Sequence, residues 1–147
     1  MTTTDHTAPP RILILGTLSG GYRGADTTGQ SHLEYPPNTY ILPIRTAAIF
    51  PPSFYLGAFR HGIDGIIVMY SGTDSPFKGE SDRTAQIINE TYTLMRKEGR
   101  DPRRLRLTAI CTVCSRPFLQ EIQQMNALLA DIGPAAPASP VPAAVAA

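Results

Sequence analysis

The sequence of 147 residues has no tryptophan and only two cysteines, and its charges nearly cancel, with 13 Lys and Arg against 12 Asp and Glu. A formal net charge of +1 gives no electrostatic reason to expect binding to nucleic acid or to an anionic membrane. No apolar run approaches the roughly 20 residues needed to cross a bilayer. The opening stretch MTTTDHTAPPR has neither the basic nor the apolar segment of a signal peptide, so we expect a cytoplasmic protein.

The scarcity of cysteine also limits metal chemistry. Cys111 and Cys114 are the only thiols, and two thiolates cannot complete a four-ligand zinc or iron–sulfur site by themselves. The three histidines lie far from each other and from the cysteines in the sequence: His6, His32 and His61. No G-x-S-x-G motif supports a serine hydrolase. We therefore predict neither a catalytic residue nor a complete metal site in this chain.

The composition, 42% hydrophobic and 17% charged, is that of a globular protein, and the length suits one domain. The lead-in at residues 1–10 is expected to be flexible. The Pro/Ala-rich stretch 134–147 carries no charge and is expected to be a disordered tail. A single α/β domain is then expected over residues 11–133.

Short apolar runs alternate with amphipathic segments between these ends. Strands are expected at 11–16, 39–44, 65–70 and 105–110, and helices at 51–62, 81–98 and 116–133. This alternation predicts a three-layer α/β fold, flavodoxin-like in style, with a mostly parallel four-stranded sheet and helices on both faces. Pro43 lacks an N–H group, which favours a sheet edge or a strand end for 39–44.

Ligands of such folds bind beyond the carboxyl ends of the strands. The segment GTLSGG at 16–21 follows the first strand, but it matches neither the Walker A nor the dinucleotide-binding motif, so we interpret it as a tight turn. Cys111 and Cys114 follow the last strand and precede a helix N-terminus, which lowers the pKa of thiols. A dithiol couple, half of a metal site shared with a partner, and two small core residues remain open interpretations.

Three segments agree in order and spacing with one family. YRGADTTGQSHLEYPPN (22–38), PPSFYLGAFRHGIDGIIVM (51–69) and DPRRLRL (101–107) resemble motifs of the methyl-viologen-reducing hydrogenase delta subunit family. The resemblance extends over about residues 11–134. It implies a structural and docking role, rather than chemistry, for the matching residues Tyr22, Gly24, Ala25, Asp26, Gly29, Tyr35, Pro36 and Pro37.

The resemblance further implies a difference from the family. Its members are expected to carry five cysteines that, all or in part, hold a [2Fe–2S] cluster. The corresponding positions in this sequence are Thr17, Gly20, Thr46, Met69 and Asp74. None of these residues is a thiolate or an imidazole, which are the groups that bind such clusters. We therefore expect no cofactor in this chain.

The family also implies partners. These are a heterodisulfide-reductase-A-like flavin and iron–sulfur subunit, carrying FAD and [4Fe–4S] clusters, and further oxidoreductase subunits. The leading hypothesis is a docking subunit of a soluble redox complex for flavin-based electron transfer, which has lost its own [2Fe–2S] cluster. One alternative is an electron-transfer subunit that uses Cys111 and Cys114 as a dithiol or as ligands of a shared cluster. A second alternative is a module that binds a small ligand between GTLSGG and SGTDSPFKG.

Overall fold

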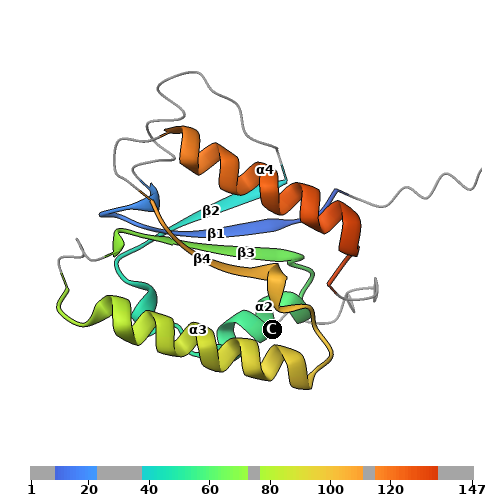
Figure 1. The fold of residues 1–147 in the computed structure, drawn as a ribbon, viewed down its shortest axis with the longest axis horizontal. Helices are drawn as coiled ribbons and strands as arrows, with labels where there is room; N and C mark the ends of the chain where they lie inside the picture. Colours follow the sequence, from blue (N-terminus) through green and yellow to red (C-terminus); the bar gives the residue numbers. More distant parts are fainter. Residues whose placement is uncertain (1–8, 23–37, 73–76, 111–114, 136–147) are drawn as a thin grey trace, which may run out of the picture.

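The computed structural model describes residues 9–22, 38–72, 77–110 and 115–135. Its centre is a four-stranded sheet in the order β2-β1-β3-β4, in which every pairing is parallel (Figure 1). The strands are Ile12–Thr17 (β1), Thr39–Ile44 (β2), Gly65–Tyr70 (β3) and Leu105–Ala109 (β4). The α-helices are Pro52–Arg60 (α2), Glu80–Lys97 (α3) and Ser115–Ile132 (α4). Two short 3-10 helices, Ala47–Ile49 (η1) and Pro102–Arg104 (η3), complete the described elements.

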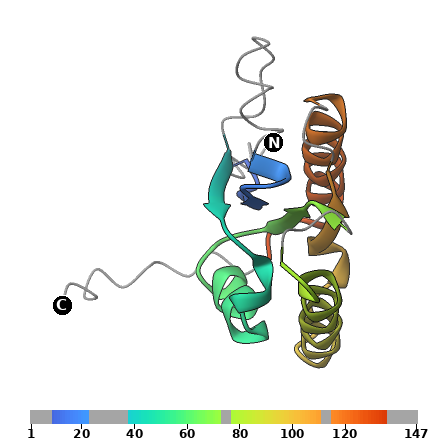
Figure 2. The same cartoon turned by 90° about the vertical axis from the view of Figure 1, so that its left-hand side faces the viewer.

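The predicted three-layer architecture is confirmed. Helix α4 covers one face of the sheet, and α2 and α3 cover the other (Figures 1 and 2). The central strands β1 and β3 are apolar on both faces, so alternate residues enter two separate cores. Ile14 and Ile67 pack with residues of α4, whereas Leu15 and Val68 pack with residues of α2 and α3. Pro43 favoured a sheet edge or a strand end for residues 39–44, and β2 lies at an edge of the sheet.

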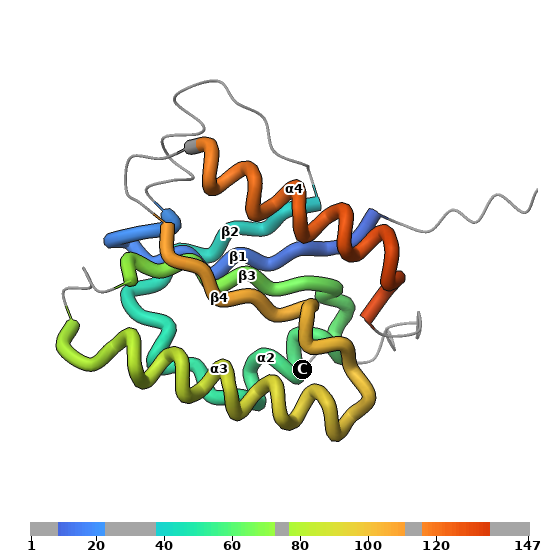
Figure 3. The backbone as a smooth tube through the Cα atoms, viewed as in Figure 1, coloured from blue at the N-terminus to red at the C-terminus, as the bar shows by residue number. Residues whose placement is uncertain are grey.

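The amino ends of the strands are held by two side chains, which we call the Asp64–Arg104 clamp. The carboxylate of Asp64 accepts hydrogen bonds from the backbone N–H groups of Arg11 and Ala135, both at 2.9 Å. The buried guanidinium of Arg104 donates to the carbonyl of Asp64 at 3.2 Å and to that of Pro134 at 3.2 Å. The clamp thus joins the beginning of β1 to the segment after α4, at one end of the molecule (Figure 3).

Ala135 falls within the stretch that the sequence assigns to a tail, and it is nevertheless tied to the domain. Besides its N–H bond to Asp64, its carbonyl accepts a hydrogen bond from Arg100 at 2.8 Å. The remainder of the expected tail, 136–147, and the expected lead-in at 1–8 lie outside the described residues.

Candidate functional site

The carboxyl ends of β1, β3 and β4 meet at one edge of the sheet, as the sequence predicts for parallel strands. After β1 the chain makes a tight turn in which the N–H of Gly20 donates to the carbonyl of Thr17 at 3.0 Å. The hydroxyl oxygens of Ser19 and Ser71 lie 3.1 Å apart, which joins this turn to the residue after β3. The expected turn at GTLSGG is therefore present and packs against the neighbouring strand.

The packing of this turn leaves no room for side chains at its two glycines. A β-carbon on Gly20 would lie 2.8 Å from the backbone nitrogen of Ser71 and 2.8 Å from the carbonyl carbon of Tyr70. A β-carbon on Gly21 would lie 2.3 Å from the β-carbon of Met69. Carbon atoms in contact prefer about 3.5–4.0 Å, so both positions require glycine in this conformation.

The structure brings together three of the five positions where the family resemblance implies cluster ligands. Thr17 is 1% exposed, Gly20 is buried beside it, and Met69 is fully buried in β3. The hydroxyl of Thr17 has no hydrogen-bond partner among the described residues. Thr46 follows β2, and its hydroxyl accepts the N–H of Ala48 at 3.1 Å, which caps η1. Asp74 lies outside the described residues.

These side chains do not fit a [2Fe–2S] cluster. Iron in such clusters is bound by thiolates or imidazoles, whereas Thr17 and Thr46 offer hydroxyls and Met69 a buried thioether. Gly20 has no side chain, and the backbone of β3 occupies the space that a cysteine β-carbon would need. In the part of the chain that the structure covers, no three His, Cys, Asp or Glu side chains are grouped as metal ligands.

The other predicted site residues lie mostly outside the described ranges. Cys111 and Cys114 fall between the ends of β4 and α4, in a gap of the described chain. Seven residues of the predicted docking motif fall in the gap at 23–37: Gly24, Ala25, Asp26, Gly29, Tyr35, Pro36 and Pro37. Tyr22 is described and 39% exposed. The roles assigned to these residues remain predictions.

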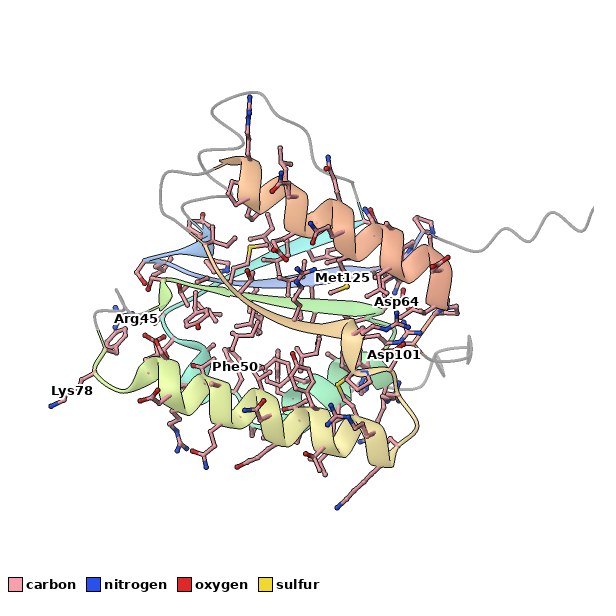
Figure 4. The ribbon with its side chains drawn as sticks, viewed as in Figure 1. Arg45, Phe50, Asp64, Lys78, Asp101 and Met125 are labelled. Atoms are coloured by element: carbon pink, nitrogen blue, oxygen red, sulfur yellow. The ribbon has the colours of Figure 1, made fainter. Side chains whose placement is uncertain are left out.

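A group of exposed residues at the same end was not predicted from the sequence. Leu18 is 45% exposed, Ile49 68% and Phe77 48%, and each follows the carboxyl end of a strand. Arg45 and Lys78 are exposed and lie at this end of the molecule, whereas Asp64 and Asp101 lie at the other end (Figure 4). We call these five residues the carboxyl-end surface. The signal available in the sequence was large apolar residues in the segments that lead from strands to helices, where binding residues are common.

The helices of the described part are too short or too polar to span a membrane. Comparison with known proteins shows that the family model for the methyl-viologen-reducing hydrogenase delta subunit matches residues 12–133. The iron-sulfur subunit of the F420-non-reducing hydrogenase of Archaeoglobus profundus is 24% identical over 127 residues, which is 85% of this chain and 92% of that protein.

Longer relatives match as well. The ferredoxin:CoB-CoM heterodisulfide reductase A protein of Methanosarcina mazei is 31% identical over 121 residues, which is 77% of this chain. The corresponding heterodisulfide reductase A protein of Methanosarcina acetivorans is 31% identical over 117 residues. The chain spans 14% of the length of each of these two proteins. Since the family model covers both cores and all four strands, the chain belongs to the methyl-viologen-reducing hydrogenase delta subunit family.

Proposed function

We propose that this chain is a docking subunit of a redox complex of the hydrogenase and heterodisulfide reductase type, and that it holds no [2Fe–2S] cluster. Its partner in this proposal is a heterodisulfide-reductase-A-like subunit that carries the FAD and [4Fe–4S] groups. The chain contributes a folded surface to that complex and leaves electron transfer to its partners.

The relatives support the assignment to a complex. The same module is a 14% segment of two heterodisulfide reductase A proteins, and it makes up 92% of a separate hydrogenase iron-sulfur subunit. A module that is covalently part of one protein, and a separate chain elsewhere, is expected to contact the rest of that protein in both arrangements. The heterodisulfide-reductase-A-like protein is therefore the partner to test directly.

The packing of Gly20 carries the proposal that the cluster is absent. A ligand residue at this position needs a β-carbon, and the backbone of Ser71 and Tyr70 fills that space. The polar atoms of Thr17 and Thr46 are hydroxyls, which do not replace thiolates on iron. The turn therefore serves to close the carboxyl end of the sheet.

Metal analysis tests the cluster part of the proposal. The purified chain, before and after anaerobic treatment with iron and sulfide, is assayed for iron, acid-labile sulfide and visible absorption. We expect no stoichiometric iron and no cluster bands. The hydrogenase iron-sulfur subunit of Archaeoglobus profundus, treated in parallel, is the matched control.

A stoichiometric cluster in this chain would contradict the proposal. In that case Cys111→Ser and Cys114→Ser decide the alternative, because they are the only thiols of the sequence. Loss of the absorption bands in these variants would assign the cysteines as ligands of the metal.

Binding to the partner tests the docking part. The purified chain is titrated calorimetrically with the purified heterodisulfide-reductase-A-like protein of the same organism. We expect saturable binding with one chain per partner molecule. No detectable heat, together with separate elution of the two proteins in gel filtration, would contradict the docking role.

A further inference from the structure

The carboxyl-end surface combines exposed apolar side chains with positive charge. Leu18, Ile49 and Phe77 expose between 45% and 68% of their surface at the end of the sheet where the turn closes. The backbone N–H of Leu18 donates to the carbonyl of Ile44 at 2.9 Å, so Leu18 lies beside the strand end that leads into Arg45. Ile49 belongs to η1, which packs against α3, and Phe77 and Lys78 lie just before that helix. Large exposed apolar residues on neighbouring elements are typical of protein–protein contacts.

The cations of this surface have no ion-pair partner among the described residues. The ion pairs among all the described residues are Arg60–Glu98, Arg100–Glu98, Arg103–Asp101 and Arg106–Glu121. Arg45 and Lys78 take part in none of them. Among the described residues, the acidic ones nearest to Lys78 in the sequence are Glu80 and Asp82, in the first turn of α3, where they offset the positive end of that helix.

We propose that the carboxyl-end surface binds the partner protein, and that the patch of the partner that it contacts is apolar at its centre and acidic at its border. This inference rests on the proposed function and adds to it the surface of contact and the charge of the partner. Apolar residues supply most of the affinity of such contacts, whereas complementary charges set orientation and the rate of association.

Two other occupants fit the charges less well. In a symmetric dimer through this surface, the same patch of both copies would meet, so the cations of both copies would share one interface. The Pro/Ala-rich stretch 136–147 contains no acidic residue to pair with them. An acidic partner protein is the occupant that the charges favour.

Charge reversal tests this surface. The double variant Arg45→Glu/Lys78→Glu and the single variant Ile49→Ser are titrated with the purified heterodisulfide-reductase-A-like protein, after circular dichroism has shown that they fold. We expect each to raise the Kd at least about tenfold. The matched control is Arg96→Glu/Lys97→Glu, because both cations are exposed in the last turn of α3 and form no ion pair among the described residues. Its Kd should stay within about twofold of the wild type.

Ionic strength gives a second readout. The Kd of the wild type should rise with added salt, and the Arg45→Glu/Lys78→Glu variant should show a weaker rise or none. Equal affinity of wild type and both variants would overturn the assignment of this surface while the docking function stands. Failure of the wild type itself to bind would instead contradict the docking function. A wild-type dimer in sedimentation that Ile49→Ser dissociates would overturn the acidic partner as occupant and show that a second copy covers the surface.

Discussion

Two tyrosines of the core show how much the surroundings of one hydroxyl matter. Tyr55 on α2 is fully buried, and its hydroxyl has no hydrogen-bond partner among the described residues. Tyr92 on α3 is partly buried, and its hydroxyl donates to the carbonyl of Leu105 at 3.0 Å. A buried polar atom without a partner costs stability, whereas one that is paired contributes a little.

This contrast predicts opposite effects of the same chemical change. Tyr55→Phe should raise the free energy of unfolding by about 1 kcal/mol, because it removes an unpaired buried hydroxyl. Tyr92→Phe should lower it by about 1 kcal/mol, because the carbonyl of Leu105 loses its donor. Urea unfolding of both variants at neutral pH checks the prediction. A loss of similar size in both would contradict it.

Alkaline pH gives a related prediction. Burial raises the pKa of Tyr55 above its ordinary value of 10.0, so the unfolded chain releases this proton at lower pH than the folded one. Titration of Tyr55 therefore leaves the free energy of unfolding unchanged below about pH 10 and lowers it above that pH, by at most about 1.4 kcal/mol per pH unit. Urea unfolding between about pH 9 and pH 11 should show a shallower decline for Tyr55→Phe than for the wild type. Burial also raises the pKa of Tyr92, so the variant keeps part of the decline. Identical slopes for variant and wild type would exclude this linkage.

The stability of the turn after β1 should be sensitive to added side-chain volume, which glycine-to-alanine substitutions can test. Gly21→Ala should lower the free energy of unfolding by roughly 1–3 kcal/mol, because its β-carbon would meet that of Met69. Gly57→Ala is the matched control, since it lies in α2 with nothing within 4 Å of the added carbon. That variant should be neutral or up to about 1 kcal/mol more stable, because alanine favours helix. Thermal unfolding of both variants checks the prediction. Equal losses of stability would show that crowding at the turn is not the cause.

Much of the element plan was predictable from the sequence. The strands predicted at 39–44 and 65–70 have the bounds of β2 and β3. Residues 65–70 were the clearer case, because they form a continuous apolar run between Asp64 and Ser71. The helix predicted at 51–62 ends instead at Arg60, before Gly62, which takes a left-handed conformation with φ of 102°. Helix α3 begins at Glu80, one residue earlier than predicted.

The short elements and the spatial contacts were not predictable in the same way. The two 3-10 helices are fixed by single side chains, Thr46 and Asp101, each of which accepts a backbone N–H two residues later. Helices of three residues are too short to show a periodic pattern of apolar residues, so the sequence pattern does not indicate them. The requirement for glycine at position 21 depends on Met69, far along the chain, because β1 and β3 are neighbours only in the folded sheet. The carboxyl-end surface was missed for the same reason.

At the scale of the whole molecule, the Asp64–Arg104 clamp predicts a coupling between distant parts of the chain. Asp64→Ala removes the acceptor of both the Arg11 and the Ala135 N–H groups. We expect a loss of about 1–3 kcal/mol in the free energy of unfolding and faster hydrogen exchange at both amides. Glu90→Ala, at an exposed carboxylate in the middle of α3, is the control. Faster exchange at only one of the two amides would argue against a shared clamp.

The clamp also fixes where the two ends of the domain leave the fold. Arg11 and Ala135 both lie at the amino end of the sheet, whereas Arg45 and Lys78 lie at the opposite end (Figures 3 and 4). A polypeptide linker attached at either end would therefore start at the end of the sheet that lies away from the carboxyl-end surface. Joined in this way to a larger protein, the domain would meet its contact at an effective concentration in the millimolar range, set by the linker length. A domain that is not joined to its partner would lack this advantage, and its binding would depend on its affinity alone.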